Sequence, residues 1–376
     1  MIVEFVSLLI VLFAYSSIAK SRLPEYQKRK KLLITVGVII VMVSGLRNLA
    51  VGADTYQYYL SFQDVLTTPW NQILQAFPDY FVYGIGKDPG YSFLVKSFQI
   101  IFPDFRCFLF VIIATFSYAL LRLLYKLNVP LKGIIVSYLL YDALFYAFFS
   151  ITGLRQTIAT TVSLLVVPYV FSKKPIKFIL PLLLFSLIHK SLLIFIVFYL
   201  FNYLKNPKRI VIYAAILFFP MWAVGQSLGQ FLIAGTLFDQ YEEYLAGTYD
   251  TNGAVNFAIL FYAIILILIT NYNKIESVRP ENRILSCALA FAIFYTPMTA
   301  VGPSQMRIVQ YYSIFLLVLL PDIIQSIDKK WGGKYYLVCF LLFAYACKNK
   351  LDYGFFWDTV YISGLNLGKG ILIQGW

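Results

Sequence analysis

The stretch Arg47-Asn-Leu-Ala-Val-Gly52-Ala-Asp54-Thr-Tyr-Gln-Tyr58-Tyr-Leu-Ser-Phe62 follows a hydrophobic run and opens a long polar segment. It places an arginine, a glycine, an acid and several tyrosines where an expected membrane helix has just ended. Most other segments between the hydrophobic runs are short and basic. The stretch therefore indicates a membrane protein whose polar chemistry is concentrated near one helix end.

Composition places most of the chain in a membrane. Its 376 residues are 60% hydrophobic and only 13% charged, whereas about a quarter of the residues of a soluble chain are charged. No polar block is long enough for a separate globular domain, so we expect a single integral membrane domain over 1–376. The first hydrophobic run, 2–19, lacks a basic start and a small-residue cleavage site, which predicts an N-terminus that is retained.

The net charge of +13 is distributed in a way that predicts topology. Most basic residues fall in six short clusters between hydrophobic runs, as the positive-inside rule predicts for cytoplasmic loops, and this pattern argues against nucleic acid as a partner. Two longer segments, 61–90 and 225–253, are acidic and are expected outside. This arrangement gives an all-α polytopic protein with about 12 transmembrane helices and both termini outside. The crossings are expected at 2–19, 32–47, 105–126, 133–150, 152–171, 176–189, 190–204, 210–225, 254–272, 284–299, 304–324 and 335–347.

The segment 91–102 is too short to cross. At ~1.5 Å per residue it spans about 18 Å of a hydrocarbon core that is ~30 Å thick. We expect a re-entrant or interfacial half-helix here, within a periplasmic loop over 48–104. The run 178–204 is interpreted as two short helices that turn at His189; a single long tilted helix would invert every later loop.

In this topology the unusual ionisable residues gather on the outer side: Arg47, Asp54, Arg155, His189 and Arg307. Ionisable groups at helix ends in a membrane protein are costly unless they are paired or used. Three arginines without an equal supply of nearby carboxylates suggest an anion from elsewhere, and guanidinium groups suit phosphate oxygens. The pattern indicates an extracytoplasmic pocket for a lipid-linked phosphate or pyrophosphate.

Structural interpretations stand beside these functional ones. An arginine at a helix end is often an interfacial anchor, and a lone histidine at a turn is more often structural than catalytic. Asp54 suits the N-cap of a helix beginning near Thr55, and Asp142 could pair with Arg155 and make that arginine structural. The tyrosines of the 48–104 loop suit either an interfacial aromatic belt or stacking on sugar rings. The sequence has no Asp-x-Asp pair, Cys/His cluster or glycine-rich phosphate loop, so we expect no metal, nucleotide or cofactor.

The pattern Arg47-x4-Gly52-x-Asp54-Thr55-x2-Tyr58-x3-Phe62 resembles the signature of the EpsG family, bacterial membrane proteins grouped with Wzy-type O-antigen and exopolysaccharide polymerases. Further similarities follow in chain order: Asp88-Pro89-Gly90-Tyr91 resembles Glu-Pro-Gly-Tyr, Arg155-Gln156-x2-Ala159 an Arg-Gln-x-x-Ala helix start, His189-Lys190-Ser191 a His-x-Ser turn, and Arg307 a late arginine. The resemblance covers about residues 30–325. Asp88 departs from the pattern, in which glutamate is expected.

The resemblance implies a GT-C-like architecture and a glycosyltransferase of the bacterial cytoplasmic (inner) membrane, with its active site facing the periplasm or exterior. It implies undecaprenyl-pyrophosphate-linked oligosaccharides as both donor and acceptor, and membrane lipids and a chain-length regulator as further partners. No nucleotide is needed outside, because the energy is already in the glycosyl-pyrophosphate bond.

The resemblance also assigns roles. The implied site residues are the base candidates His189 and Asp54, the pyrophosphate-binding Arg155, Arg307 and Arg47, and the glycan-binding Tyr58, Tyr91 and Gln156. The arginines would stabilise the departing pyrophosphate, and the base would take the proton of the acceptor hydroxyl. The acidic loop 225–253 is expected to form a lid or a glycan groove.

Three alternatives stay open at this point. A lipid-linked oligosaccharide flippase or other transporter would favour charges near the bilayer midplane. A membrane O-acyltransferase would also use a histidine in a helical bundle. An O-antigen ligase would share the donor and differ in its acceptor.

Overall fold

The computed structural model describes residues 2–52, 54–233, 252–300, 303–348, 353–358, 360–362 and 371–373. Contacts divide the chain into two compact units. The first unit comprises Met1–Pro168, Ile179–Leu192 and Tyr336–Trp376, and the second comprises Tyr169–Phe178 and Leu193–Tyr335. The expectation of a single domain over 1–376 stays a prediction.

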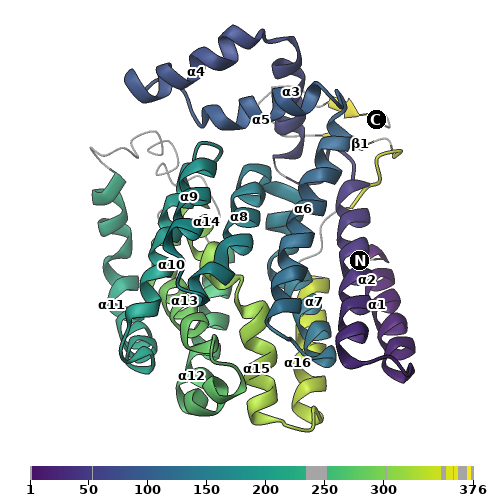
Figure 1. Cartoon of the computed structure of the whole chain (residues 1–376), viewed down its shortest axis with the longest axis vertical. Helices are drawn as coiled ribbons and strands as arrows, with labels where there is room; N and C mark the ends of the chain where they lie inside the picture. The colour runs from purple at the N-terminus through teal and green to yellow at the C-terminus, as the bar shows by residue number, and fades with distance from the viewer. Residues whose placement is uncertain are drawn as a thin grey trace. The chain divides into compact units, whose positions relative to one another are not determined.

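Helices make up nearly all of the described chain (Figure 1). In order they are α1 (Ile2–Lys20), α2 (Glu25–Gly45), α3 (Thr55–Thr67), α4 (Trp70–Val82), α5 (Pro89–Gln99), α6 (Phe105–Lys126), α7 (Leu131–Leu144), the π-helix η1 (Tyr146–Thr152), α8 (Leu154–Phe171), α9 (Pro175–Phe185), the 3-10 helix η2 (Lys190–Ile196), α10 (Val197–Leu200), the 3-10 helix η3 (Phe201–Tyr203), α11 (Pro207–Ile233), α12 (Asn252–Val278), α13 (Asn282–Tyr295), the 3-10 helix η5 (Thr296–Ala300), α14 (Pro303–Ser313), α15 (Leu316–Ile327) and α16 (Gly333–Lys348). Two short strands, β1 (Val360–Ile362) and β2 (Ile371–Ile373), pair antiparallel, with Tyr361 opposite Leu372.

Local sequence explains where several helices begin. Pro24, Pro69 and Pro130 stand directly before α2, α4 and α7, and Pro89 is the first residue of α5. Proline suits the first turn of a helix because its missing N–H would lack an intrahelical partner there. Asp104 caps α6, since its side chain accepts a hydrogen bond from the backbone N–H of Cys107 at 2.8 Å.

In the first unit, α2 packs against α1, α6 and α7. Helices α3, α4 and α5 gather at one end of α6, and α4 and α5 run across its axis (Figure 1). One core cluster joins this end to the start of α8; its members include Leu49, Phe62, Tyr91, Phe108 and Leu154. The polar segment after α2 is therefore folded helical structure, packed on the start of α6 and α8.

In the second unit, α13 packs against α11, α12 and α14, and α12 packs against α15. A buried ion pair joins the end of α12 to α15. Arg279 donates from Nε to Asp322 Oδ2 at 2.7 Å and from a terminal nitrogen to Oδ1 at 3.1 Å, and the Asn282 amide donates to Oδ2 at 2.9 Å. Arg279 belongs to one of the basic clusters between hydrophobic runs, and the structure makes it the partner of a buried carboxylate.

The polytopic character of the chain is confirmed. Among the described residues, five helices are long and apolar enough to cross a membrane, in α1, α6, α8, α11 and α12. Two bent pairs, α7 with η1 at 67° and α14 with α15 at 47°, bring the number to seven if each is one span. The remaining expected crossings fall on helices with shorter apolar stretches, such as α9, α13 and α16. The count of twelve stays a prediction.

The structure describes the first of the two segments expected outside the membrane, the half-helix 91–102, and only part of the second, the acidic loop 225–253. A short helix is found where the half-helix 91–102 was expected, since α5 has 11 residues and at ~1.5 Å per residue is too short to span. Its re-entrant or interfacial position stays a prediction. The acidic loop 225–253 begins inside α11, and its residues 234–251 lie outside the described residues.

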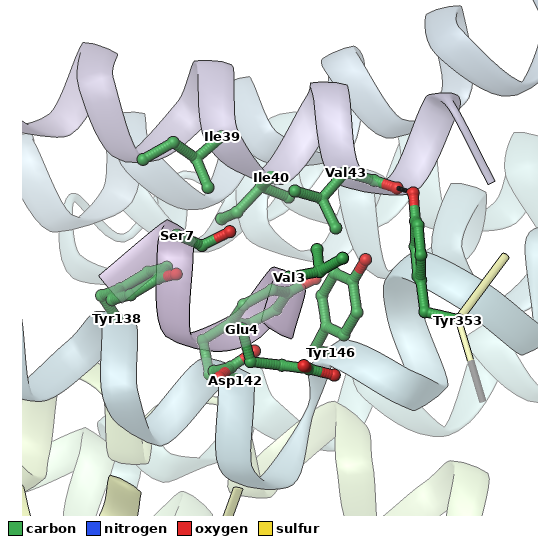
Figure 2. A pocket seen from close by; sticks show the side chains of 11 residues that line it. Val3, Glu4, Ser7, Ile39, Ile40, Val43, Tyr138, Asp142, Tyr146 and Tyr353 are labelled. Atoms are coloured by element: carbon green, nitrogen blue, oxygen red, sulfur yellow. Dashed lines mark hydrogen bonds between the residues drawn. The ribbon is translucent and has the colours of Figure 1, made fainter. Parts of the chain in front are cut away.

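A small cavity in the first unit holds two carboxylates (Figure 2). It lies between α1, α2 and α7, is lined by Glu4, Tyr138 and Asp142, and has a volume of about 20 Å³, which is room for one water. Asp142 therefore faces another acid. Arg155, which could have paired with it, forms its ion pair with Asp88 instead.

Candidate functional site

Three helix beginnings in the first unit bring together an acid, an arginine and the histidine. Asp88 precedes α5, Arg155 is the second residue of α8, and His189 lies in the turn between α9 and η2. An Asp88 carboxylate oxygen lies 3.4 Å from a terminal nitrogen of Arg155 and 3.8 Å from Nδ1 of His189. The predicted residues Arg155 and His189 thus share one carboxylate that the sequence had not assigned to the site.

Gly90 determines how closely α5 approaches the histidine turn. Its N–H donates to the carbonyl of Leu187 at 3.0 Å. A Cβ at position 90 would lie 2.8 Å from the backbone carbon and oxygen of Leu187, which is too close for any side chain. The glycine therefore lets the start of α5 rest on the turn that carries His189, and this contact sets the position of Asp88.

Asp88 has an unusual backbone. Its φ of 43° and ψ of 61° lie in the left-handed region, and its side chain makes no capping hydrogen bond to α5. Such a conformation costs a non-glycine residue about 1 kcal/mol or more and tends to occur at functional sites. Here it accompanies a carboxylate that faces Arg155 and His189 rather than the start of its own helix.

Asp88 engages the guanidinium of Arg155 only partly, so Arg155 can bind a second anion. At 3.4 Å its contact with Asp88 is longer than a good charge-assisted hydrogen bond. Its side chain is 31% exposed, whereas that of His189 is 6% exposed. Arg155 also stands in the first turn of α8, where unpaired backbone N–H groups and the helix dipole favour negative charge.

Two tyrosines orient the guanidinium of Arg155. Its central carbon lies 4.8 Å from the ring centroid of Tyr91 and 6.0 Å from that of Tyr58, and the two rings meet edge to face at 5.9 Å. Such cation–π contacts hold a guanidinium by its face and leave its N–H edges available. Tyr91 is buried, and burial raises the pKa of its phenol, so the hydroxyl stays protonated. Both tyrosine rings pack against Arg155, and the expected contact of Tyr58 and Tyr91 with a glycan stays a prediction.

Arg47 serves a different purpose in the structure. It is fully buried, and its terminal nitrogens donate to the carbonyls of Ser44 at 2.6 Å, Ser150 at 3.0 Å and Ile151 at 3.0 Å. These bonds hold the end of the π-helix η1 just before α8 begins. Its terminal nitrogens face backbone oxygens, and the predicted role of Arg47 in binding pyrophosphate stays a prediction.

Two more residues of the signature stretch, Thr55 and Gly52, also contact the end of η1. Thr55 donates its hydroxyl to the carbonyls of Val51 at 2.7 Å and Ile151 at 3.1 Å. Gly52 has a φ of +95°, and a Cβ there would lie 2.5 Å from the Ile151 side chain. The stretch therefore packs against the end of η1 and fixes the position of the start of α8, which carries Arg155.

The other predicted residues are placed as follows. Asp54 occupies the N-cap position of α3 without a capping side-chain bond, one turn before Tyr58, whose ring faces Arg155. Gln156 is buried beside Arg155 in α8, so its expected contact with a glycan stays a prediction. Arg307 is a half-buried residue of α14 in the second unit.

Asp88 belongs to the candidate site although the sequence pattern did not assign it there. Two features of the sequence could have identified it. Asp88 is an acid directly before Pro89 at an expected helix start, and Gly90 is a residue that allows another backbone segment to pack closely beside it. Neither signal names Arg155 or His189 as a partner, because those contacts join positions 67 and 101 residues apart.

The fold and the site define a polytopic membrane protein in which an aspartate, an arginine and a histidine meet at converging helix starts. The sequence model of the EpsG family matches residues 30–356. The chain belongs to the EpsG family. No curated protein and no solved structure matches the chain.

Proposed function

We propose that this protein is a bacterial polysaccharide polymerase of the O-antigen or exopolysaccharide type, a glycosyltransferase that joins undecaprenyl-pyrophosphate-linked repeat units. It would act on the outer face of the cytoplasmic membrane, within a twelve-crossing, GT-C-like fold. The observation that carries the proposal is the meeting of Arg155, Asp88 and His189 at the start of α8 in a chain of the EpsG family.

In the proposed reaction, the bond between the anomeric carbon of the donor glycan and its pyrophosphate breaks, and the pyrophosphate keeps the electron pair. A hydroxyl of the incoming lipid-linked unit forms the new glycosidic bond and gives its proton to a base. Arg155 and the N-terminus of α8 would stabilise the leaving pyrophosphate. A similar role for Arg307 stays a prediction from the family resemblance. This assignment needs no nucleotide.

His189 is our preferred base, with Asp54 as the alternative. The Asp88 carboxylate, 3.8 Å from its Nδ1, supports this choice because a neighbouring carboxylate stabilises the imidazolium that forms when the base takes a proton. Asp88 is then a positioning residue for both His189 and Arg155. Loss of a general base costs on the order of 10²–10⁴ in rate.

The test is glycan chain length in a strain that lacks the gene, complemented with each variant. We expect single capped repeats without long chains from His189→Ala and Asp88→Asn at normal membrane levels, and long chains from Asp88→Glu, which restores the residue of the family pattern. Asp79→Asn, at a half-buried acid of α4, is the matched control. Long chains from both His189→Ala and Asp88→Asn would refute the assigned site.

The same strain separates the alternatives. A flippase predicts that every capped form disappears, and a ligase predicts that polymer forms but stays on its lipid carrier. The proposed orientation is tested by cysteine labelling from outside: Asp64→Cys should react and Lys330→Cys should be protected, and the reverse pattern would invert the topology.

A further inference from the structure

Helix α4 exposes an apolar face that no other described element covers. Only Ile73 is buried in this helix, whereas Leu74 and Phe81 are 52% and 63% exposed. Leu74 and Phe81 are seven residues apart and therefore lie on one face of the helix. Gln72 and Asp79 have the same spacing and lie on the opposite face. The helix is thus amphipathic, and its apolar side is open.

A second open apolar surface follows α5. Ile100 and Ile101 are each 71% exposed and Phe102 is 51% exposed. Helix α6, one of the candidate membrane spans, begins at Phe105. Because a chain extends at most ~3.6 Å per residue, Ile101 lies within about 14 Å of the first residue of that span. Residues 100–102 therefore lie near the expected membrane boundary, and α4 and α5 run across the axis of α6 (Figure 1).

The placement of Lys96 and Trp70 also fits a position of α4 and α5 at the membrane–water interface. Lys96, the basic residue of α5, donates its ammonium to the carbonyls of Val65 and Leu66, each at 3.0 Å, and so turns toward the end of α3. Trp70 opens α4 partly exposed and packs edge to face on Phe93 at 5.9 Å. Tryptophan is enriched at membrane–water interfaces, and exposed apolar patches mark interaction sites.

We propose that α4 and residues 100–102 lie in the lipid–water interface at the end of α6. The face of Leu74 and Phe81 would contact acyl chains, and the face of Gln72 and Asp79 would contact water. A helix of this kind buries its apolar face about 5–10 Å into the headgroup and acyl boundary. Lipid is the chosen occupant because residues 100–102 lead directly into a candidate membrane span, and α4 packs on α5, the helix that precedes them.

The experiment uses the full chain with its four cysteines replaced by serine, reconstituted in phosphatidylcholine–phosphatidylglycerol vesicles. Single cysteines, Leu74→Cys and Phe81→Cys against Gln72→Cys and Asp79→Cys, carry an environment-sensitive NBD label. We expect blue-shifted emission and quenching by nitroxide-labelled lipid at positions 74 and 81, and quenching by aqueous iodide at 72 and 79. Ile101→Cys gives a second, independent position that should behave like 74.

Two results would overturn the proposal. Equal iodide quenching at all of these positions would place the helix in water. Shielding of 74 and 81 from both quenchers would show that protein covers the face, and cross-linking between Leu74→Cys copies would then identify a second copy of the chain as the occupant.

Discussion

Replacement of Gly90 by alanine tests the contact that sets the candidate site. In a helix, alanine is ordinarily the better residue by about 1 kcal/mol, so the default expectation is a small gain in stability. Here the added Cβ would stand 2.8 Å from the backbone of Leu187, where an ordinary contact needs 3.4 Å, so the two segments must separate by about 0.6 Å. We therefore expect the opposite sign.

The magnitude follows from three contributions. Overpacking against backbone costs about 1–3 kcal/mol, a lengthened hydrogen bond between the Gly90 N–H and the Leu187 carbonyl loses part of about 1 kcal/mol, and the helix propensity of alanine offsets up to about 1 kcal/mol. We expect a net loss of about 1–2 kcal/mol in unfolding free energy. The shift also moves Asp88 relative to His189, and since a 1 Å misplacement can cost on the order of 10² in rate, activity should fall about 10-fold or more.

The assay compares Gly90→Ala with Gly86→Ala in the same loop. A Cβ at Gly86 meets no atom within 4 Å, and its φ of +87° adds backbone strain alone. Both are measured by unfolding of the detergent-purified protein and by glycan chain length in the complemented strain. If Gly90→Ala unfolds no more easily than the native protein and still makes full-length glycan, the docking of α5 on the histidine turn does not position the site.

Further predictions concern the two arginine contacts and the absence of a metal requirement. Arg155→Lys should shorten the glycan and reduce polymerisation on the order of 10²-fold, because a point charge lacks the guanidinium fork. The control Arg122→Lys should leave chain length unchanged. Equal chain length in the two variants would make Arg155 an interfacial anchor. Asp322→Asn should destabilise the protein by about 3–5 kcal/mol, because Arg279 is left buried without its counter-charge, and unchanged thermal unfolding would contradict this. Purified protein given lipid-linked repeat units should polymerise in excess EDTA, because arginines can neutralise the leaving group, and activity restored only by Mg²⁺ or Mn²⁺ would overturn that assignment.

Much of the architecture follows from local sequence. Hydrophobic runs between basic clusters indicate membrane helices directly, and prolines such as Pro69 and Pro130 mark helix starts without reference to the rest of the chain. The placement of His189 in a turn between two short helices was predicted and is confirmed. The number of crossings is harder to predict, because bent and short helices leave the boundary between a span and a half-span open. The bend of 67° between α7 and η1 is one such case.

The roles of individual residues depend on contacts that no local pattern contains. Arg47 and Arg155 have the same chemistry and both stand at helix ends, so the sequence treats them alike. The difference arises because Arg47 meets the carbonyls of Ser150 and Ile151, more than a hundred residues away, while Arg155 meets a carboxylate and two aromatic rings. A guanidinium surrounded by carbonyls is held in place by them, whereas one beside a loosely paired acid keeps donors for a ligand.

The contrast between Arg47 and Arg155 gives the signature stretch a definite physical role. Arg47, Gly52 and Thr55 converge on Ile151, the penultimate residue of the π-helix, and so fix where that helix ends. Helix α8 begins two residues after the end of η1, so the position of Arg155 depends on that clamp. Gly90 does the same for the Asp88 carboxylate by docking α5 on the turn of His189. The most recognisable motif of the chain thus acts on the proposed site indirectly, by setting the geometry of the residues that face it.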